Sequence, residues 1–138
     1  MDAETGAFAC LSPEEMAAYE GVEAMQRIVH ETAVNAGWHL DRKTGIPFER
    51  NFGEVIALCH SELSEALEAH RKGNGRDDKL PWHDAMTVEL ADAVIRIFDI
   101  AGARKLNLAA AILDKNKFNK TRADHQLANR NAVGGKAY

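Results

Sequence analysis

The chain has few of the residues that build disulfide-stapled or membrane-spanning proteins. Its 138 residues include two cysteines and three prolines. The two cysteines, Cys10 and Cys59, have no paired spacing, which excludes a disulfide framework or a cysteine-ligated zinc site and favours a reducing, cytoplasmic location. No apolar run approaches the roughly 20 residues of a membrane helix, and no signal peptide is recognisable at the N-terminus. We therefore expect no membrane association.

An excess of basic charge is also lacking. Lysine and arginine together number 17, against 21 acidic residues, so the formal net charge is −4. A protein whose main partner is a nucleic acid polymer needs a basic surface to neutralise phosphates, and we expect no such partner here. The hydrophobic share of 46% is ordinary for a globular protein. The length predicts one domain over residues 1–138, with a core over about 12–122 and a polar tail over 123–138.

Strand signals are nearly absent, because no segment alternates with a period of two in β-branched or aromatic residues. The sequence predicts an all-α protein, a bundle of four to five helices. Ser12, Pro13 and Glu15 form a capping box with proline at the first helical position, and Asn107 is placed to cap the last long helix. The expected helices cover residues 12–36, 52–72, 84–101 and 107–122.

Two glutamates of the second expected helix lie where water should be scarce. At about 100° per residue, Glu62 falls inside the apolar arc of this helix and Glu65 falls at its edge. A carboxylate among apolar neighbours is costly unless a cation or metal accompanies it. The alternative is an ordinary solvated face.

The third expected helix is apolar over roughly 240° of its circumference, which is typical of a helix central to a core or buried in an oligomer. Its narrow polar strip carries three acids and one arginine, namely Glu89, Asp92, Arg96 and Asp99. This strip indicates a functional site. A buried ion-pair network around Arg96 is the alternative.

The fourth expected helix carries a row of polar side chains on its most apolar arc. That arc is marked by Leu108, Ala111, Ile112 and Phe118. Lys115, Asn119 and Arg122 fall within it, whereas Lys117 and Lys120 are expected to point outward. An inward cationic row calls for anionic partners, unless the long side chains only extend over the core to reach water.

Together, the acidic residues of the second and third expected helices and the Lys/Asn/Arg row of the fourth suit the binding of a metal and a polyphosphate. Two acidic pairs at i, i+3 would bring four carboxylates together if the second and third helices lie side by side. Hard oxygen ligands of this kind favour Mg²⁺ or Mn²⁺, and zinc is disfavoured because no histidine accompanies the acids at ligand spacing. The metal would polarise phosphoryl oxygens, and lysine and arginine would neutralise the remaining charge.

The acidic motifs of the sequence resemble those of a known family. Glu62-x-x-Glu65 followed by Glu89-x-x-Asp92 is similar to the ExxE…ExxD signature of the MazG-like, all-α nucleoside triphosphate pyrophosphatases. The segments GEVIALCHSELSEALEAHRKG, DDKLP, VELADAVIRIFDIAG and DKNKFNKTR also resemble that family. The likeness covers about residues 50–122.

The resemblance implies a function and a set of site residues. The family hydrolyses nucleoside triphosphates between the α and β phosphates, using Mg²⁺, and commonly forms dimers or tetramers. The implied catalytic metal ligands are Glu62, Glu65, Glu89 and Asp92. The implied phosphate or sugar ligands are Lys115, Asn119 and Arg122.

Further residues are candidates for supporting or base-binding roles, and alternative functions remain open. Arg96 and Asp99 are candidates to support the metal ligands. Trp38, His39 and Trp82 are available to stack on a base, or else they pack at the edge of the core. The expected role is removal of a non-standard or surplus nucleotide from the pool. The alternatives are a phosphoribosyl-ATP pyrophosphohydrolase and a non-catalytic nucleotide- or metal-binding regulator on the same fold.

Overall fold

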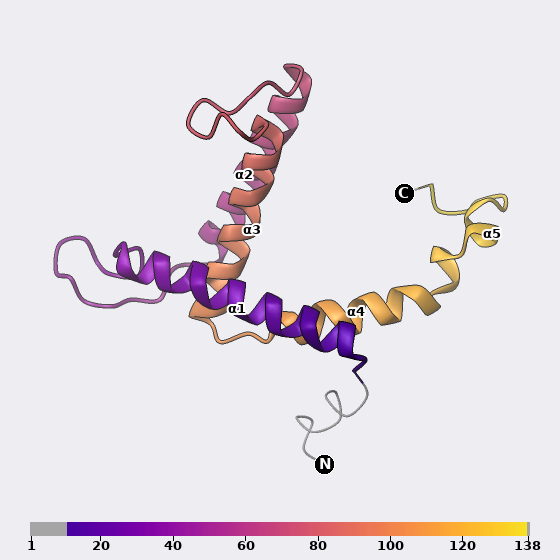
Figure 1. Cartoon of the computed structure of the whole chain (residues 1–138), viewed down its shortest axis with the longest axis horizontal. Coiled ribbons are helices and arrows are strands. Elements are labelled where there is room, and N and C mark those ends of the chain that lie inside the picture. Colours follow the sequence, from indigo (N-terminus) through magenta and orange to yellow (C-terminus); the bar gives the residue numbers. More distant parts are fainter. Residues whose placement is uncertain (1–10, 138) are drawn as a thin grey trace, which may run out of the picture. The chain divides into compact units, whose positions relative to one another are not determined.

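The computed structural model describes residues 11–137, and all regular secondary structure in this range is helical. The elements are α1 (Pro13–Asn35), α2 (Phe52–Arg71), α3 (Ala85–Ala103), α4 (Leu108–Thr121), the 3₁₀ helix η2 (Ala123–His125) and the short α5 (Leu127–Arg130) (Figure 1). Extended pairing in the described range is limited to isolated bridges, Leu40 with Pro47 and Arg76 with Asp84. The all-α prediction is confirmed, and the four long helices begin and end within two residues of the expected bounds. The expected polar tail contains η2 and α5.

Local sequence signals explain where the helices begin and end. Ser12 Oγ accepts a hydrogen bond from the Glu15 amide at 3.2 Å, and Glu15 Oε2 accepts one from the Ser12 amide at 2.9 Å. This is the predicted capping box. Gly37 follows α1 with φ of 82°, a left-handed conformation that glycine adopts without strain. Asn107 caps α4 by accepting a hydrogen bond from the Ala110 amide at 3.0 Å.

The contacts divide the chain into two compact units. Ala24–Leu106 form one, called here the α2–α3 unit. Residues 11–23 and 107–137 of the described chain belong to the other, called here the α4 unit. Helix α1 contributes its first half to the α4 unit and its second half to the α2–α3 unit. Both predicted groups of site residues can be placed by unit: the acids lie in the α2–α3 unit and the Lys/Asn/Arg row in the α4 unit.

Helices α2 and α3 pack side by side (Figure 1). The buried apolar residues of these two helices are Val55, Cys59 and Ala66 from α2, and Ala93, Ile100 and Ala101 from α3. Alanine on both helices allows the backbones to approach closely. Burial raises the pKa of the free Cys59 thiol, as expected for a core cysteine. Cys10 lies outside the described residues.

The α4 unit packs around Tyr19 and Ala109, both of which are buried. Asn107 Nδ2 donates to Tyr19 Oη at 3.0 Å. Nearer the end of α4, Lys117 Nζ lies 3.1 Å from Glu15 Oε1. Lys117 therefore faces α1.

This packing contradicts the predicted phase of α4. Ile112 and Phe118, expected to point inward, are 45% and 57% exposed. Lys117, expected to point outward, is paired with Glu15. The physical reason lies in the run from Leu108 to Leu113, where six successive residues are apolar. Such a run presents apolar groups on every side of a helix, so periodicity does not select the packed face.

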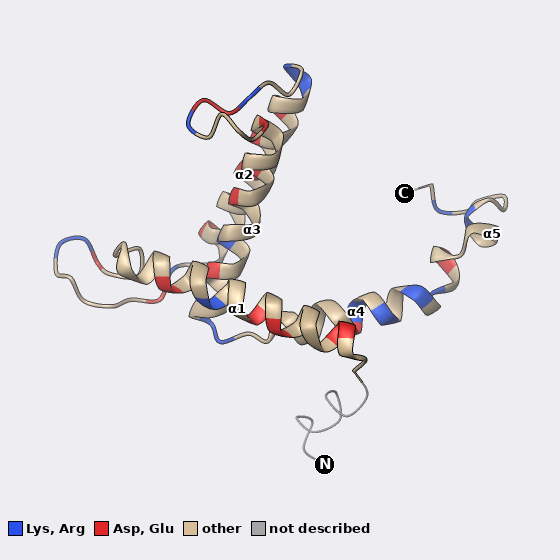
Figure 2. Cartoon of the chain, in the orientation of Figure 1, with Lys and Arg blue, Asp and Glu red and all other residues tan. Residues whose placement is uncertain are grey.

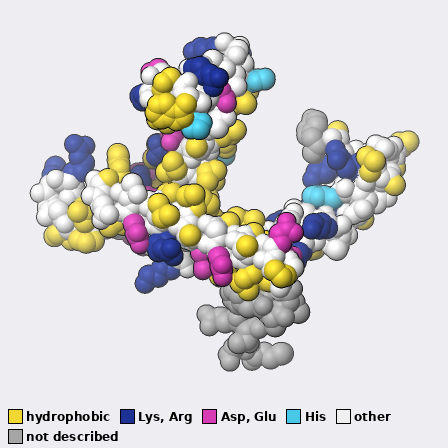
Figure 3. Space-filling view, in the orientation of Figure 1, with side chains coloured by type: hydrophobic (Ala, Val, Ile, Leu, Met, Phe, Trp, Pro, Cys, Tyr) yellow, Lys and Arg dark blue, Asp and Glu magenta, His cyan; other side chains and the backbone are white. Residues whose placement is uncertain are grey.

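Apolar residues of α2 and α3 reach the surface of the α2–α3 unit (Figure 3). On α3, Leu90, Val94 and Ile97 are each more than 40% exposed, and Leu67 on α2 is 58% exposed. The broad apolar arc predicted for α3 is thus only partly buried within one chain. Over residues 11–137, none of the helices combines the length and apolar character required to cross a bilayer.

Candidate metal centre

The helices α2 and α3 bring three of the four predicted acids together. Glu62, Glu89 and Asp92 each offer a carboxylate oxygen, and these oxygens lie within 4.8 Å of one another. Glu62 is buried, whereas Glu89 and Asp92 are half-buried. In Figure 2, acidic positions are coloured red on the ribbons of both helices of this unit. These acids converge because residues at i, i+3 spacing share one face of a helix, and because α2 and α3 pack side by side.

Glu65, the fourth predicted acid, stands at the edge of this cluster. It is exposed and does not join the other three carboxylates within 4.8 Å. Its charge still acts on the site, because it is one of the charges that raise the pKa of Glu89. This agrees with its predicted place at the rim of the apolar arc.

The cluster carries negative charge that is incompletely compensated. Burial raises the pKa of Glu89, and repulsion by neighbouring acids raises it further. Burial and the charge of Glu62 likewise raise the pKa of Asp92, against opposing effects of Arg96 and Lys79. The part of these pKa shifts that comes from neighbouring acids indicates a place where a further positive charge would be stabilised.

Arg96 supplies part of that positive charge. Its Nε donates to Glu62 Oε1 at 2.6 Å, and its Nη2 lies 2.5 Å from the same oxygen. The sequence left open a buried ion-pair network around Arg96, and the structure shows one such pair, between Arg96 and Glu62. The predicted supporting role for Arg96 is consistent with this contact, because the guanidinium orients a candidate ligand.

The α2–α3 loop contributes two charges that the sequence analysis did not assign. Asp77 raises and Lys79 lowers the pKa of Asp92. Asp77 Oδ1 accepts hydrogen bonds from the amides of Lys79 and Leu80 at 2.9 and 2.7 Å, which holds the loop in a turn. Both residues lie in the DDKLP segment, so its resemblance to the family was the available signal.

A cavity of about 310 Å³ borders the acidic cluster inside the α2–α3 unit. Its charged lining comes from Arg50, Glu62, Asp92, Arg96 and Asp99, and its apolar lining includes Trp38, Val55 and Ile95. A cavity with an apolar wall and a few convergent charged groups is the usual form of a small-molecule site.

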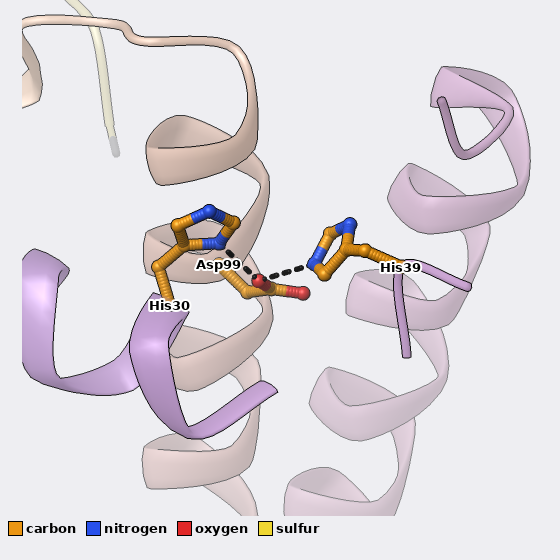
Figure 4. A group of neighbouring side chains, drawn as sticks. All are labelled: His30, His39 and Asp99. Carbon is orange, nitrogen blue, oxygen red and sulfur yellow. Dashed lines mark hydrogen bonds and ion pairs between the residues drawn. The ribbon is translucent and has the colours of Figure 1, made fainter. Parts of the chain in front are cut away.

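The three predicted base-stacking groups have different surroundings. Trp38 is 65% exposed and lines the cavity. Trp82 is 67% exposed, lies beside His83 and is not part of that lining. His39 turns its ring toward Asp99 (Figure 4). Of the three, Trp38 is therefore the best placed to meet a base.

The side chains of two histidines contact the carboxylate of Asp99 (Figure 4). His30 Nδ1 and His39 Nε2 each lie 2.8 Å from Asp99 Oδ1. The sequence predicts Asp99 as a supporting residue but gives no sign of His30. No local pattern could identify it, because His30 and Asp99 are 69 positions apart.

Of the predicted phosphate-binding row, Lys115 and Asn119 lie on α4, where basic residues are frequent (Figure 2), and Arg122 follows its last residue. Lys115 Nζ is 5.0 Å from the centre of the Phe118 ring. Arg122 is hydrogen-bonded to Asp124 at 2.9 and 2.5 Å, and this bonding raises the pKa of Arg122. Asn119 Oδ1 is buried without a hydrogen-bond partner. An unpaired amide oxygen of this kind can accept a hydrogen bond from a ligand or a solvent molecule.

Comparison with known proteins gave no match to a family model, to a curated protein or to a solved structure. The resemblance to the MazG-like pyrophosphatases therefore rests on the residues quoted above.

Proposed function

We propose that this protein is a Mg²⁺-dependent nucleoside triphosphate pyrophosphohydrolase. The reaction adds one water across the anhydride between the α and β phosphates, and it yields a monophosphate and pyrophosphate. The observation that carries this proposal is the convergence of Glu62, Glu89 and Asp92 beside a cavity that also contains two arginines. Carboxylates for a metal and cations for phosphate are what such a substrate requires.

Glu62, Glu89 and Asp92 would hold the metal, with Glu65 at the rim. The donor set fits Mg²⁺ or Mn²⁺, because all of its atoms are hard oxygens. The pKa values of Glu89 and Asp92 are raised by burial and then by neighbouring negative charge, and a divalent cation would neutralise that charge, which supports the assignment. When bound, the ion would polarise phosphoryl oxygens.

The chain's own residues would then position the substrate. Arg50 and Arg96 line the cavity and would neutralise phosphate charge. Trp38 would stack on the base at the same cavity. Lys115, Asn119 and Arg122 are proposed to bind phosphate or sugar on the strength of the family resemblance.

We further propose that the protein is a homo-oligomer, either a dimer or a tetramer. Leu90, Val94 and Ile97 recur at helical spacing on one side of α3 and are more than 40% exposed. A second copy of the chain would remove this surface from water, and self-complementary apolar faces are typical of homodimer interfaces.

The proposed biological role is nucleotide-pool sanitation. The experiment that tests the activity is a panel of canonical and modified NTPs and dNTPs, together with phosphoribosyl-ATP, assayed for pyrophosphate release with Mg²⁺, with Mn²⁺ and with EDTA. We expect metal-dependent release from at least one NTP or dNTP. Preference for phosphoribosyl-ATP would instead assign the biosynthetic reaction. Nucleotide binding without turnover would assign a regulator, and full activity in EDTA would overturn the metal centre.

A further inference from the structure

A second group of potential metal ligands lies away from the acidic cluster. It consists of His30 from α1, His39 from the α1–α2 loop and Asp99 from α3, and is called here the His–His–Asp group. Both ring nitrogens lie 2.8 Å from Asp99 Oδ1. The ring centroids are 5.1 Å apart, with the ring planes inclined at 73°, so the imidazoles approach the oxygen from different directions (Figure 4).

The surrounding backbone makes room for this group and holds it. A Cβ at Gly102 would lie 2.6 Å from both Cβ and Cγ of His30. Any larger residue at position 102 would therefore displace His30 from Asp99. His39 is held through its carbonyl, which accepts a hydrogen bond from the Phe48 amide at 3.1 Å.

The carboxylate of Asp99 has little compensation other than the two histidines. Asp99 is 7% exposed. Its nearest cation is Arg50, whose Nη1 lies 3.9 Å from Oδ2 and thus leaves Oδ1 to the rings. A buried carboxylate is costly unless a cation or strong donors neutralise it. A metal ion among Oδ1 and the two ring nitrogens would provide that charge.

We propose that the His–His–Asp group binds a divalent transition-metal ion of the Zn²⁺ type. Two imidazole nitrogens and one carboxylate oxygen are borderline ligands that suit zinc and its neighbours rather than Mg²⁺. Around four-coordinate zinc, ligand atoms are separated by about 3.4 Å, given bonds of roughly 2.1 Å. The two 2.8 Å contacts need to lengthen by only about half an ångström to reach this value. Asp99 also lines the cavity, which can supply solvent as the fourth ligand.

This site is distinct from the acidic cluster in both chemistry and position. The acidic cluster offers three carboxylate oxygens, whereas the His–His–Asp group offers two nitrogens and one oxygen. Asp92 and Asp99 are seven residues apart on α3, which is about 10 Å along a helix axis. That separation is too large for the roughly 3.5–4 Å of a shared two-metal centre. The inference therefore does not depend on the proposed pyrophosphohydrolase activity.

The test is calorimetric titration of the metal-free full chain with Zn²⁺ alone. His39→Gln and Asp99→Asn should each weaken the Zn²⁺ site by about 100-fold or more, since even the loss of a hydrogen-bond partner to a ligand costs 10- to 100-fold. His60→Gln is the matched control, because His60 is exposed on α2. A Glu62→Gln/Asp92→Asn double variant should keep this site, because it alters only the acidic cluster.

Substitution by Co²⁺ gives a readout that does not rely on variants. Bound Co²⁺ should show the visible absorption of nitrogen-ligated, four-coordinate cobalt, and paramagnetic shifts should appear at the ring protons of His30 and His39. If Asp99→Asn does not fold by circular dichroism, His39→Gln and these spectra decide the question. Zn²⁺ binding that survives His39→Gln, or that is lost in the Glu62→Gln/Asp92→Asn variant, would overturn the proposal.

Discussion

Arg96 holds the buried carboxylate of Glu62 through two nitrogens that meet one oxygen: Nε is 2.6 Å and Nη2 is 2.5 Å from Oε1. Glu62 is 7% exposed, so this guanidinium is its main source of charge compensation within the single chain. A divalent cation bound at the acidic cluster would share that oxygen with Arg96 or displace it. The pair would thereby link the stability of the metal-free protein to the proposed metal binding.

Arg96→Gln should destabilise the metal-free protein by about 1–3 kcal/mol, because a buried carboxylate loses its charged donor. Mg²⁺ should stabilise this variant more than the wild type, since no guanidinium competes for Glu62. Denaturant unfolding in EDTA and in Mg²⁺ measures both effects. Arg71→Gln, at the exposed end of α2, is the control. Wild-type stability of Arg96→Gln in EDTA would show that the pair is not important for folding.

Glu62→Gln and Asp92→Asn should each reduce turnover by about 100-fold or more, because each removes a charged metal ligand while keeping its shape. Glu68→Gln should leave turnover unchanged, since Glu68 is exposed and pairs with Lys72 on the same helix. Steady-state kinetics with Mg²⁺, supported by circular dichroism, makes the comparison. Loss of turnover together with loss of the helical spectrum would mean that these acids are structural, and unchanged turnover in folded variants would contradict their role as metal ligands.

Glu89→Gln should change how stability depends on pH. The pKa of Glu89 is raised above its ordinary value of 4.5, so the folded state binds this proton more tightly than the unfolded state does. The carboxyl therefore supports folding below its ordinary pKa, and that support is lost as the pH rises through the raised pKa. In EDTA, the variant should be more stable than the wild type at neutral pH, and this advantage should vanish in acid.

Thermal midpoints across a pH series compare Glu89→Gln with the wild type and with Glu68→Gln. Glu68→Gln should track the wild type, because an exposed pair contributes little. An advantage of Glu89→Gln that grows in acid would have the opposite sign and would contradict the raised pKa.

Lys115→Ala and Arg122→Ala should each lower kcat/KM by about 10- to 100-fold if they contact the substrate, which corresponds to the loss of one charge-assisted contact. Lys120→Ala should change little. Lys117→Ala breaks the pair with Glu15 and should cost at most about 1 kcal/mol of stability without a kinetic effect. Equal kinetic losses at all four positions would indicate a diffuse basic surface instead of a binding row.

Val94→Glu should shift the protein toward the monomer, because it places a charge in the exposed apolar face of α3. Sedimentation velocity over a range of concentrations measures the shift. Ser64→Glu, which adds the same charge at an exposed polar position of α2, should leave the oligomer intact. A wild type that is monomeric at every concentration would refute the proposed interface.

Much of the candidate metal centre could be predicted from residue spacing along single helices. The i, i+3 spacing of Glu89 and Asp92 already indicated a shared face, and the apolar neighbours of Glu62 already indicated burial. Glu65 could be placed only at the edge, and the structure leaves it exposed there. Asp77 and Lys79 could not be predicted as neighbours of Asp92, because loop residues have no periodicity. Their approach to Asp92 depends on how the loop turns.

By itself, the sequence determined the helices and their ends. Ser12, Gly37 and Asn107 act on backbone groups a few residues away, and such local signals need no tertiary contact. Tertiary packing alone decided which face of α4 meets α1, because the apolar run from Leu108 to Leu113 is compatible with several faces. It also decided that His30 and His39 meet Asp99. Contacts between residues so far apart in the chain arise only when α1, the following loop and α3 pack together.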